Sequence, residues 1–124
     1  MDKKTKLTLA ELLKRKEQII AAKKTKKTQN LYVNSLGAII TIEEPEASLC
    51  RDVSDMEAGE GDKYMCYECI KEPDIKSKEV QDAFGCAVPM DIVEMIFAPG
   101  EIPQIAVECM KLAGYMDGVK QVKN

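Results

Sequence analysis

Hydrophobic residues recur along the chain with two different spacings, and the two spacings predict different elements. From Leu9 to Lys24 they return every three or four positions, which predicts an amphipathic helix. Thr8 and Glu11 have the spacing of a capping box, whose side chains bind open backbone N–H groups at a helix start. Across residues 31–43 apolar and polar residues alternate instead, with Gly37 between the halves, which predicts two short strands joined by a turn.

The rest of the chain has helical patterns in short segments that prolines and glycines separate. Helices are predicted at residues 46–56, 63–71, 77–85, 89–97 and 101–114. The acidic stretch 57–62, with two glycines, is predicted to be a turn. From Ile102 to Ala113 in the last helix only Gln104, Glu108 and Lys111 are polar, and they form one narrow stripe. Such a helix is expected either at the centre of the fold or between its own core and a partner.

The predicted fold class is mainly α with a small two-stranded β-ribbon (α+β), in a single compact helical domain. With 124 residues the chain has the usual length of one domain. Residues 1–30 are predicted to form a basic amphipathic N-terminal helix and a linker, which covers residues 23–30. Residues 31–124 are predicted to form the helical domain, with the ribbon at 31–43. A lone ribbon is marginal in water, so it is expected to pack on helices or to pair with another chain.

Basic and acidic residues are unevenly distributed between the two parts. Residues 1–27 hold ten Lys and Arg against three Asp and Glu, a net charge of +7. Residues 28–124 hold eight against eighteen, a net charge of −10. The basic helix can bind nucleic acid, can be a solvated face, or can be attracted to the acidic body of its own fold or of a neighbouring copy. No aromatic residue precedes Tyr32, so a platform for stacking bases is missing and nucleic acid is the less favoured partner.

The cysteines and carboxylates form no recognisable catalytic or metal site. Cys66 and Cys69 have the spacing of half a zinc site, but the chain has no His and no second CxxC motif. A redox pair is expected at a helix N-terminus after a core strand, whereas this pair lies inside a helical pattern among acidic residues. We therefore expect structural thiols, no metal, no cofactor and no enzymatic activity.

The composition is that of a globular protein, with 45% hydrophobic and 31% charged residues. The first thirty residues are rich in Lys and lack the apolar run of a signal peptide. No apolar stretch has the length of a membrane-spanning helix. The five cysteines are expected to be reduced thiols, because their number is odd and no secretory signal accompanies them. These observations predict a cytoplasmic protein.

The apolar stretch Met90–Leu112 is the candidate partner-binding region. Most of it is expected to fill the core, and part of it to form a groove or a pairing surface. Its polar faces are narrow, Met is frequent, and its two helices are short. The candidate contact residues are Met90, Ile92, Val93, Ile96, Phe97, Ile105 and Met110. A homo-oligomer is also compatible with such a surface.

Four sequence segments follow one another along the chain in an order that is typical of one protein family. They are "LYVNSLGAIITIEEP" after the Lys-rich helix, Glu72-Pro73 at a helix end, "FGCAVPMDIVEMIFAPGEI", and the closing "LAGYMDGVKQVKN". In this order the chain resembles the XkdN-like tail assembly chaperones of phages and phage-derived contractile particles. The resemblance covers nearly the whole chain and is most specific over residues 85–124. The CxxC motif is not part of it.

The resemblance implies a non-enzymatic chaperone in the bacterial host cytoplasm that binds the tape measure protein during tail assembly. Tail tube subunits are a second candidate partner, and a longer form made by ribosomal frameshifting is a further implication. A helical groove rich in Met and Ile would cover apolar segments of a client helix and release them when tube subunits compete. Two alternatives stay open: a small regulatory protein that binds nucleic acid through the basic helix, and a structural tail or baseplate component.

Overall fold

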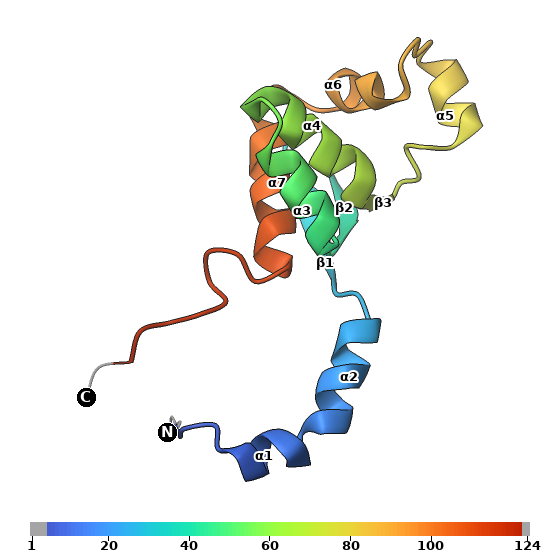
Figure 1. The fold of residues 1–124 in the computed structure, drawn as a ribbon. Helices are drawn as coiled ribbons and strands as arrows, with labels where there is room; N and C mark the ends of the chain where they lie inside the picture. The colour runs from blue at the N-terminus through green and yellow to red at the C-terminus, as the bar shows by residue number, and fades with distance from the viewer. Residues whose placement is uncertain (1–4, 123–124) are drawn as a thin grey trace.

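A computed structural model describes residues 5–122 and shows a helical arm that precedes an α+β body (Figure 1). The arm consists of α1 (Leu9–Lys14) and α2 (Lys16–Lys24). The body follows in the order β1 (Thr28–Val33), β2 (Ala38–Glu43), α3 (Ala47–Ser54), α4 (Ala58–Cys69), β3 (Ile70–Glu72), α5 (Lys78–Ala83), the 3-10 turn η1 (Pro89–Asp91), α6 (Ile92–Ile96) and α7 (Glu101–Leu112). The predicted mixture of helices and a small sheet is therefore confirmed.

The sheet has three antiparallel strands in the order β1-β2-β3, so the predicted two-stranded ribbon is incomplete. The β1–β2 hairpin lies where the alternating apolar and polar residues predicted it. Gly37 in its turn has a φ of 58°, a left-handed conformation that glycine adopts readily. The third strand was predicted as the last turn of a helix. Ile70 instead pairs with Ile42 and is buried, so a long-range contact decides its conformation. β1 also begins at Thr28, so the predicted linker is shorter.

Helix α4 begins five residues before the predicted start, and the predicted turn at 57–62 is wrong. Gly61 lies inside α4 and is buried against α3. A Cβ atom at this position would lie 3.0 Å from the Val53 carbonyl oxygen and 3.1 Å from its Cγ1 atom. The glycine therefore allows α3 and α4 to approach closely, and this packing outweighs the low helix propensity of glycine.

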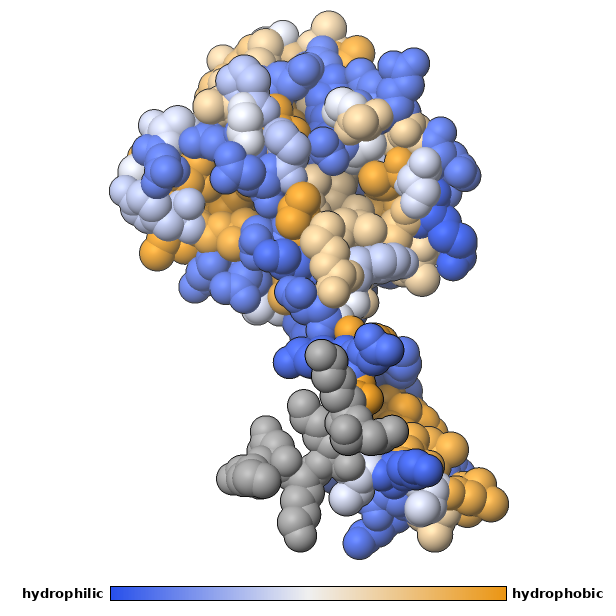
Figure 2. Space-filling view, turned by 90° about the vertical axis from the view of Figure 1, so that its left-hand side faces the viewer, coloured by the Kyte–Doolittle hydropathy of each residue, from blue (hydrophilic) through white to orange (hydrophobic). Residues whose placement is uncertain are grey.

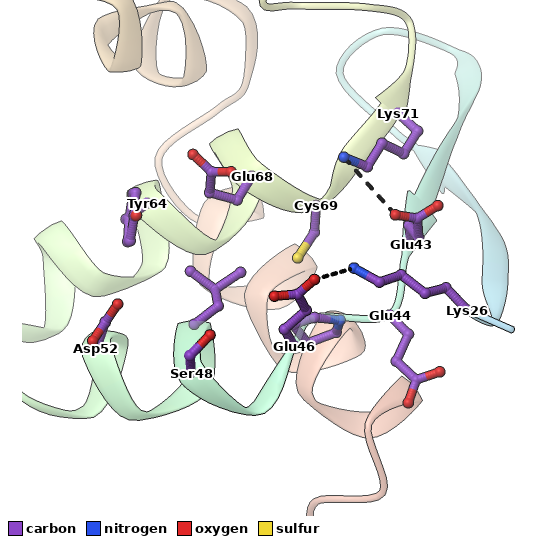
Figure 3. A pocket seen from close by; sticks show the side chains of 12 residues that line it. Lys26, Glu43, Glu44, Glu46, Ser48, Asp52, Tyr64, Glu68, Cys69 and Lys71 are labelled. Carbon is purple, nitrogen blue, oxygen red and sulfur yellow. Dashed lines mark hydrogen bonds and ion pairs between the residues drawn. The ribbon is translucent and has the colours of Figure 1, made fainter. Parts of the chain in front are cut away.

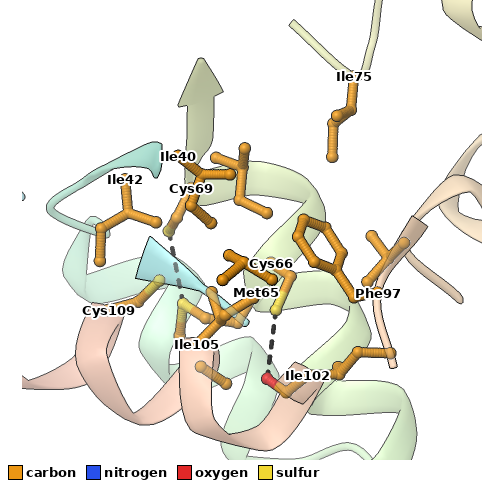
Figure 4. Close-up of a cluster of buried hydrophobic side chains, with 14 of the residues drawn as sticks. Ile40, Ile42, Met65, Cys66, Cys69, Ile75, Phe97, Ile102, Ile105 and Cys109 are labelled. Carbon is orange, nitrogen blue, oxygen red and sulfur yellow. Dashed lines mark hydrogen bonds between the residues drawn. The ribbon is translucent and has the colours of Figure 1, made fainter. Parts of the chain in front are cut away.

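The core lies between one face of the sheet and helices α4 and α7, with α6 closing one end (Figure 4). Its buried members include Ile40 and Ile42 from β2, Met65 and Cys66 from α4, and Ile105 from α7. Helices α5 and α7 end at the glycine stop signals that the sequence indicates, because Gly85 and Gly114 follow them with φ values of 66° and 91°. The predicted helix over 89–97 is split into η1 and α6.

The arm covers the predicted extent, but it is two helices rather than one. The break is at Arg15, whose φ of −88° and ψ of 1° depart from helical values. The Thr8 hydroxyl caps α1 by accepting a hydrogen bond from the Glu11 N–H at 3.2 Å. The Glu11 carboxylate pairs with Arg15 at 2.8 Å instead of closing a capping box. No residue of α1 or α2 is buried, so no tertiary packing holds the arm straight.

Candidate functional site

The seven residues predicted to contact a partner divide into two groups by burial. The core residues are Ile92, Val93, Phe97 and Ile105, whereas Met90, Ile96 and Met110 are half-buried. A side chain that the fold encloses cannot meet a partner unless the fold opens. The folded protein therefore offers only the second group for direct contact.

Helix α7 packs on the core with one side only. The narrow polar stripe allowed either a helix at the centre of the fold or a helix with one side free for a partner, and the structure shows a free outer side. The residues that it buries are Ile102, Ile105, Ala106 and Cys109. Its opposite side is exposed and carries Val107 among the polar residues. Met110 lies at the edge of the buried side. The helix is therefore a component of the core with an outer face that is partly apolar.

Helix α6 is held on the body by one lysine of α4. Lys63 Nζ lies 3.3 Å from a carboxylate oxygen of Asp91, 3.2 Å from Glu94 and 3.8 Å from Glu60. Only 12% of its side chain is exposed. Desolvation lowers the pKa of Lys63, but the hydrogen bonds to Glu94 and Asp91 outweigh it and raise the pKa overall. The ammonium group therefore stays charged, and its ion pairs add to the burial of Ile92 and Val93 in holding α6 on the body.

The start of α7 is tied to the β-hairpin by a carboxylate. Glu101 accepts hydrogen bonds from the Ser35 hydroxyl at 2.7 Å, from the Ser35 N–H at 3.0 Å and from the Ala98 N–H at 2.9 Å. The bonds from Ser35 and Ala98 hold the pKa of Glu101 below its usual value. Beside this tether a groove of about 260 Å³ runs between β1 and α7, lined by Leu31, Tyr32, Val33, Asn34, Glu101, Gln104, Ile105 and Glu108.

An apolar corner formed by Phe84, Val88 and Met95 was not predicted from the sequence. Their side chains are 47%, 54% and 50% exposed, and they lie at the end of α5, in the loop before η1 and on α6. The Cys86 thiol lies 3.6 Å from the Met95 sulfur, which brings the α5–η1 loop against α6. The helical spacing around Phe84 indicated a packed position. Its exposure depends on how the short α5 stands outside the main layer (Figure 1).

A second hollow surface lies where the arm joins the body, and we call it the acidic groove. It consists of two adjoining hollows of about 360 Å³ and 660 Å³ that share Lys26, Glu44, Pro45 and Glu46. The first is lined by carboxylates of Glu43, Glu44, Glu46, Asp52 and Glu68 (Figure 3). The second adds an apolar wall of Ala47, Leu112, Ala113 and Tyr115. The groove thus combines negative charge with apolar surface.

A comparison with protein families covers both the arm and the body. Residues 2–124 match the model of a family described as phage XkdN-like tail assembly chaperone protein. The chain belongs to this family. Among curated proteins none matches the chain, and none matches among solved structures. A tail assembly chaperone acts by binding other proteins, so the exposed apolar surfaces and the acidic groove are the parts of this family member to consider as sites.

The CxxC motif of this tail assembly chaperone family member lies inside the core. Cys66 and Cys69 are buried in α4, and the Cys66 thiol donates to the Ile102 carbonyl oxygen at 3.4 Å (Figure 4). Burial, with a smaller contribution from Asp62, raises the pKa of Cys66 to about 12. Cys109 faces Cys69, and its pKa is raised by their hydrogen bond and by burial. Because their pKa values are raised, the enclosed thiols of Cys66 and Cys109 stay protonated and pack as small apolar groups.

The described part of the chain has neither a cluster of metal ligands nor a membrane-spanning helix. Within residues 5–122, no group of three or more His, Cys, Asp or Glu residues is arranged to hold a metal ion. In the same range no helix has both the length and the apolar character that crossing a bilayer requires. The surfaces left for function are therefore the apolar corner, the groove beside α7, the acidic groove and the arm.

Proposed function

We propose that this protein acts as a tail assembly chaperone by binding the tape measure protein through the apolar corner. The half-buried Met90 and Ile96 continue this surface into the predicted contact stretch, and Met110 on α7 is a second proposed contact. Membership in the chaperone family supports tail proteins as clients. Tail tube subunits are the second proposed client, which would compete for the same surface. Assembly would take place in the host cytoplasm.

One observation carries the proposal: the large apolar side chains of Phe84, Val88 and Met95 are exposed at the end of α5, in the loop before η1 and on α6. Exposed apolar side chains that gather in one place mark a binding surface more often than scattered ones do. The buried Ile92 and Val93 and the ion pair between Lys63 and Glu94 hold α6 on the body, so Met95 keeps its position without a client. Met95 is unbranched and polarizable, so it can adapt to different segments of a long helical client.

The proposed client segment is the apolar face of a helix. The resemblance implies a tape measure protein as client, which we take to be largely helical, and an isolated amphipathic helix exposes apolar surface until it packs against a neighbour. Laying such a face on Phe84, Val88 and Met95 would remove apolar area from water on both partners. The corner is small, so the affinity would be moderate and the client could be released to tube subunits.

The test is co-expression with the tape measure protein and measurement of the affinity. Met95→Asp and Val88→Asp should each weaken binding about tenfold, because completing the burial of a half-exposed side chain contributes roughly 1.4 kcal/mol. Both variants should remain folded by circular dichroism, since neither side chain is in the core. The tape measure protein should then become insoluble in the co-expressing cells.

Two further variants serve as references. Val119→Asp changes an apolar residue that is 90% exposed outside the corner, and it should bind like the unchanged protein. Ile92→Asp puts a charge into the core and should unfold the protein, which shows what loss of fold does to the client. Normal client binding by Met95→Asp and Val88→Asp together would contradict the proposed surface.

A further inference from the structure

The arm leaves an entire apolar face without a partner. Six large apolar side chains of residues 5–24 are between 40% and 73% exposed: Leu7, Leu9, Leu12, Leu13, Ile19 and Ile20. Figure 2 shows the arm apart from the body, joined by a narrow hydrophilic neck, with apolar side chains gathered on one side. None of the six lines the acidic groove of its own chain. Short amphipathic helices are marginal in water without packing, so this face requires a neighbour.

Charge identifies the kind of neighbour. Residues 1–27 carry a net charge of +7, whereas residues 28–124 carry −10. Within residues 5–122 the acidic groove holds two carboxylates, Glu44 and Asp52, that form no ion pair. The groove also has an apolar wall, so it can bind the lysines of a basic amphipathic helix through its carboxylates and the apolar face of that helix through the wall.

The chain already uses this complementarity at the root of the arm. Lys26 Nζ lies 3.0 Å from a carboxylate oxygen of Glu46 (Figure 3). The Lys27 N–H donates to the Glu44 carboxylate at 3.1 Å. The hydrogen bond to Glu46 is the main cause that raises the pKa of Lys26. Of the lysines in α1 and α2, Lys23 also lines the groove, whereas Lys14, Lys16 and Lys24 do not.

The arm of the same chain is poorly placed to fill the rest of the groove. The Lys27 carbonyl accepts from the Glu44 N–H at 2.8 Å, and β1 begins at Thr28, so the chain direction at the root is fixed. Helix α2 ends at Lys24, at the rim of the groove. To enter its own groove the arm would have to reverse direction within Thr25–Lys27. A second copy can supply an arm from outside without this reversal.

We propose that the basic arm of one copy docks in the acidic groove of a second copy, and that two copies exchange their arms reciprocally. The apolar face of the arm covers the wall formed by Ala47, Leu112 and Ala113. The lysines of the arm lie along Glu44 and Asp52. Exchange in both directions gives each of the two arms a groove and each of the two grooves an arm. The resulting dimer is closed and has twofold symmetry.

A nucleic acid fits the arm less well than a second copy does. Phosphates would meet the lysines, but they would leave the six apolar side chains in water. Residues 1–27 contain no aromatic side chain on which a base could stack. The acidic groove would also repel a nucleic acid that lay along the root of the arm.

The first experiment measures the mass of the purified full chain by sedimentation as concentration and salt are varied. We expect a dimer of twice the 13.8 kDa chain mass at low salt, with a dissociation constant at least about tenfold weaker at high salt. Leu12→Asp with Ile20→Asp should give a monomer, because the apolar face is then lost. A wild-type protein that stays monomeric at every concentration would overturn the proposal.

A charge-reversal pair distinguishes exchange between copies from docking within one chain. Lys14→Glu with Lys16→Glu changes the net charge of residues 9–24 from +3 to −1, and Glu44→Lys with Asp52→Lys replaces two carboxylates of the groove with ammonium groups. Each double variant alone should be monomeric, since its arm and groove now repel one another. An equal mixture of the two should form a heterodimer, because each arm then matches the groove of the other chain.

Three results would count against arm exchange. A mixture that remains monomeric while the wild type dimerises would place the dimer contact elsewhere. A monomeric wild type whose arm resists protease would indicate docking within one chain. Retention of a monomeric wild type on duplex DNA would assign the arm to nucleic acid. As a matched control, Lys78→Glu with Asp82→Lys reverses an exposed pair on α5 and should leave the dimer unchanged.

Discussion

Helix α7 and the arm helices both present apolar residues every three or four positions, and both contain lysine and glutamate on their polar sides. In the fold, α7 buries four residues against the sheet and α4, whereas the arm buries none. The periodic pattern thus predicts that a segment becomes helical and that one face needs a partner. Whether the partner belongs to the same chain is decided by what lies within reach.

The largest expected effect compares matched truncations in the two regions. Ile105→Ala in α7 removes buried methyl groups and should lower the free energy of unfolding by about 2–5 kcal/mol. Leu13→Ala in the arm should change it by less than about 0.5 kcal/mol, because that side chain is exposed in the monomer. Urea unfolding at high salt measures both, since high salt suppresses arm exchange. Equal losses would show that the arm belongs to the core.

The next comparison uses the two glycines in the first turns of α4. Gly61→Ala should destabilise the protein by about 1 kcal/mol net, because overpacking against Val53 outweighs the gain in helix propensity. Gly59→Ala meets no atom within 4 Å and should stabilise the protein by about 0.5–1 kcal/mol. Thermal unfolding of the two variants measures the difference. If both substitutions stabilise, close packing of α3 on α4 is not what retains Gly61.

A smaller effect concerns the tether between the hairpin and α7. The pKa of Glu101 is lowered in the fold, so its contribution is full at neutral pH and is lost as the pH falls through the lowered value. Glu101→Gln should therefore lower the melting temperature at neutral pH, with a difference that shrinks toward zero in acid. Melting curves across this pH range test it. A difference independent of pH would mean that the carboxylate charge has no part in the tether.

The smallest expected effect is the removal of the arm. A chain without residues 1–24 should unfold cooperatively at high salt, with a free energy within about 0.5 kcal/mol of the full chain, because no arm residue is buried. It keeps Lys27, whose backbone pairs with Glu44. Calorimetry of both chains checks this domain boundary. Loss of the cooperative transition would place part of the arm in the folded domain.

The candidate site could be predicted only in part. The stretch 90–112 was recognised because it is apolar, but pattern does not separate the buried Ile92 from the exposed Met95 three residues later. In the short α6 that separation depends on where Lys63 holds the helix. Phe84 was missed because large apolar residues in a helical pattern are more often packed, and Val88 because it falls between two predicted helices. The acidic groove was also missed, since Glu44 and Glu68 are distant in sequence and meet only in the fold.

Local patterns in the sequence determined most of the elements: the β-hairpin with its turn at Gly37, the cap at Thr8, the stop at Gly85, and the uneven charge of arm and body. These features depend on neighbours within a few residues, so the chain encodes them directly. Tertiary structure decided the third strand at Ile70, the helical state of Gly61, and the side of α7 that faces the core. Those outcomes depend on contacts between distant segments, whose packing can outweigh local propensities of about 1 kcal/mol per residue.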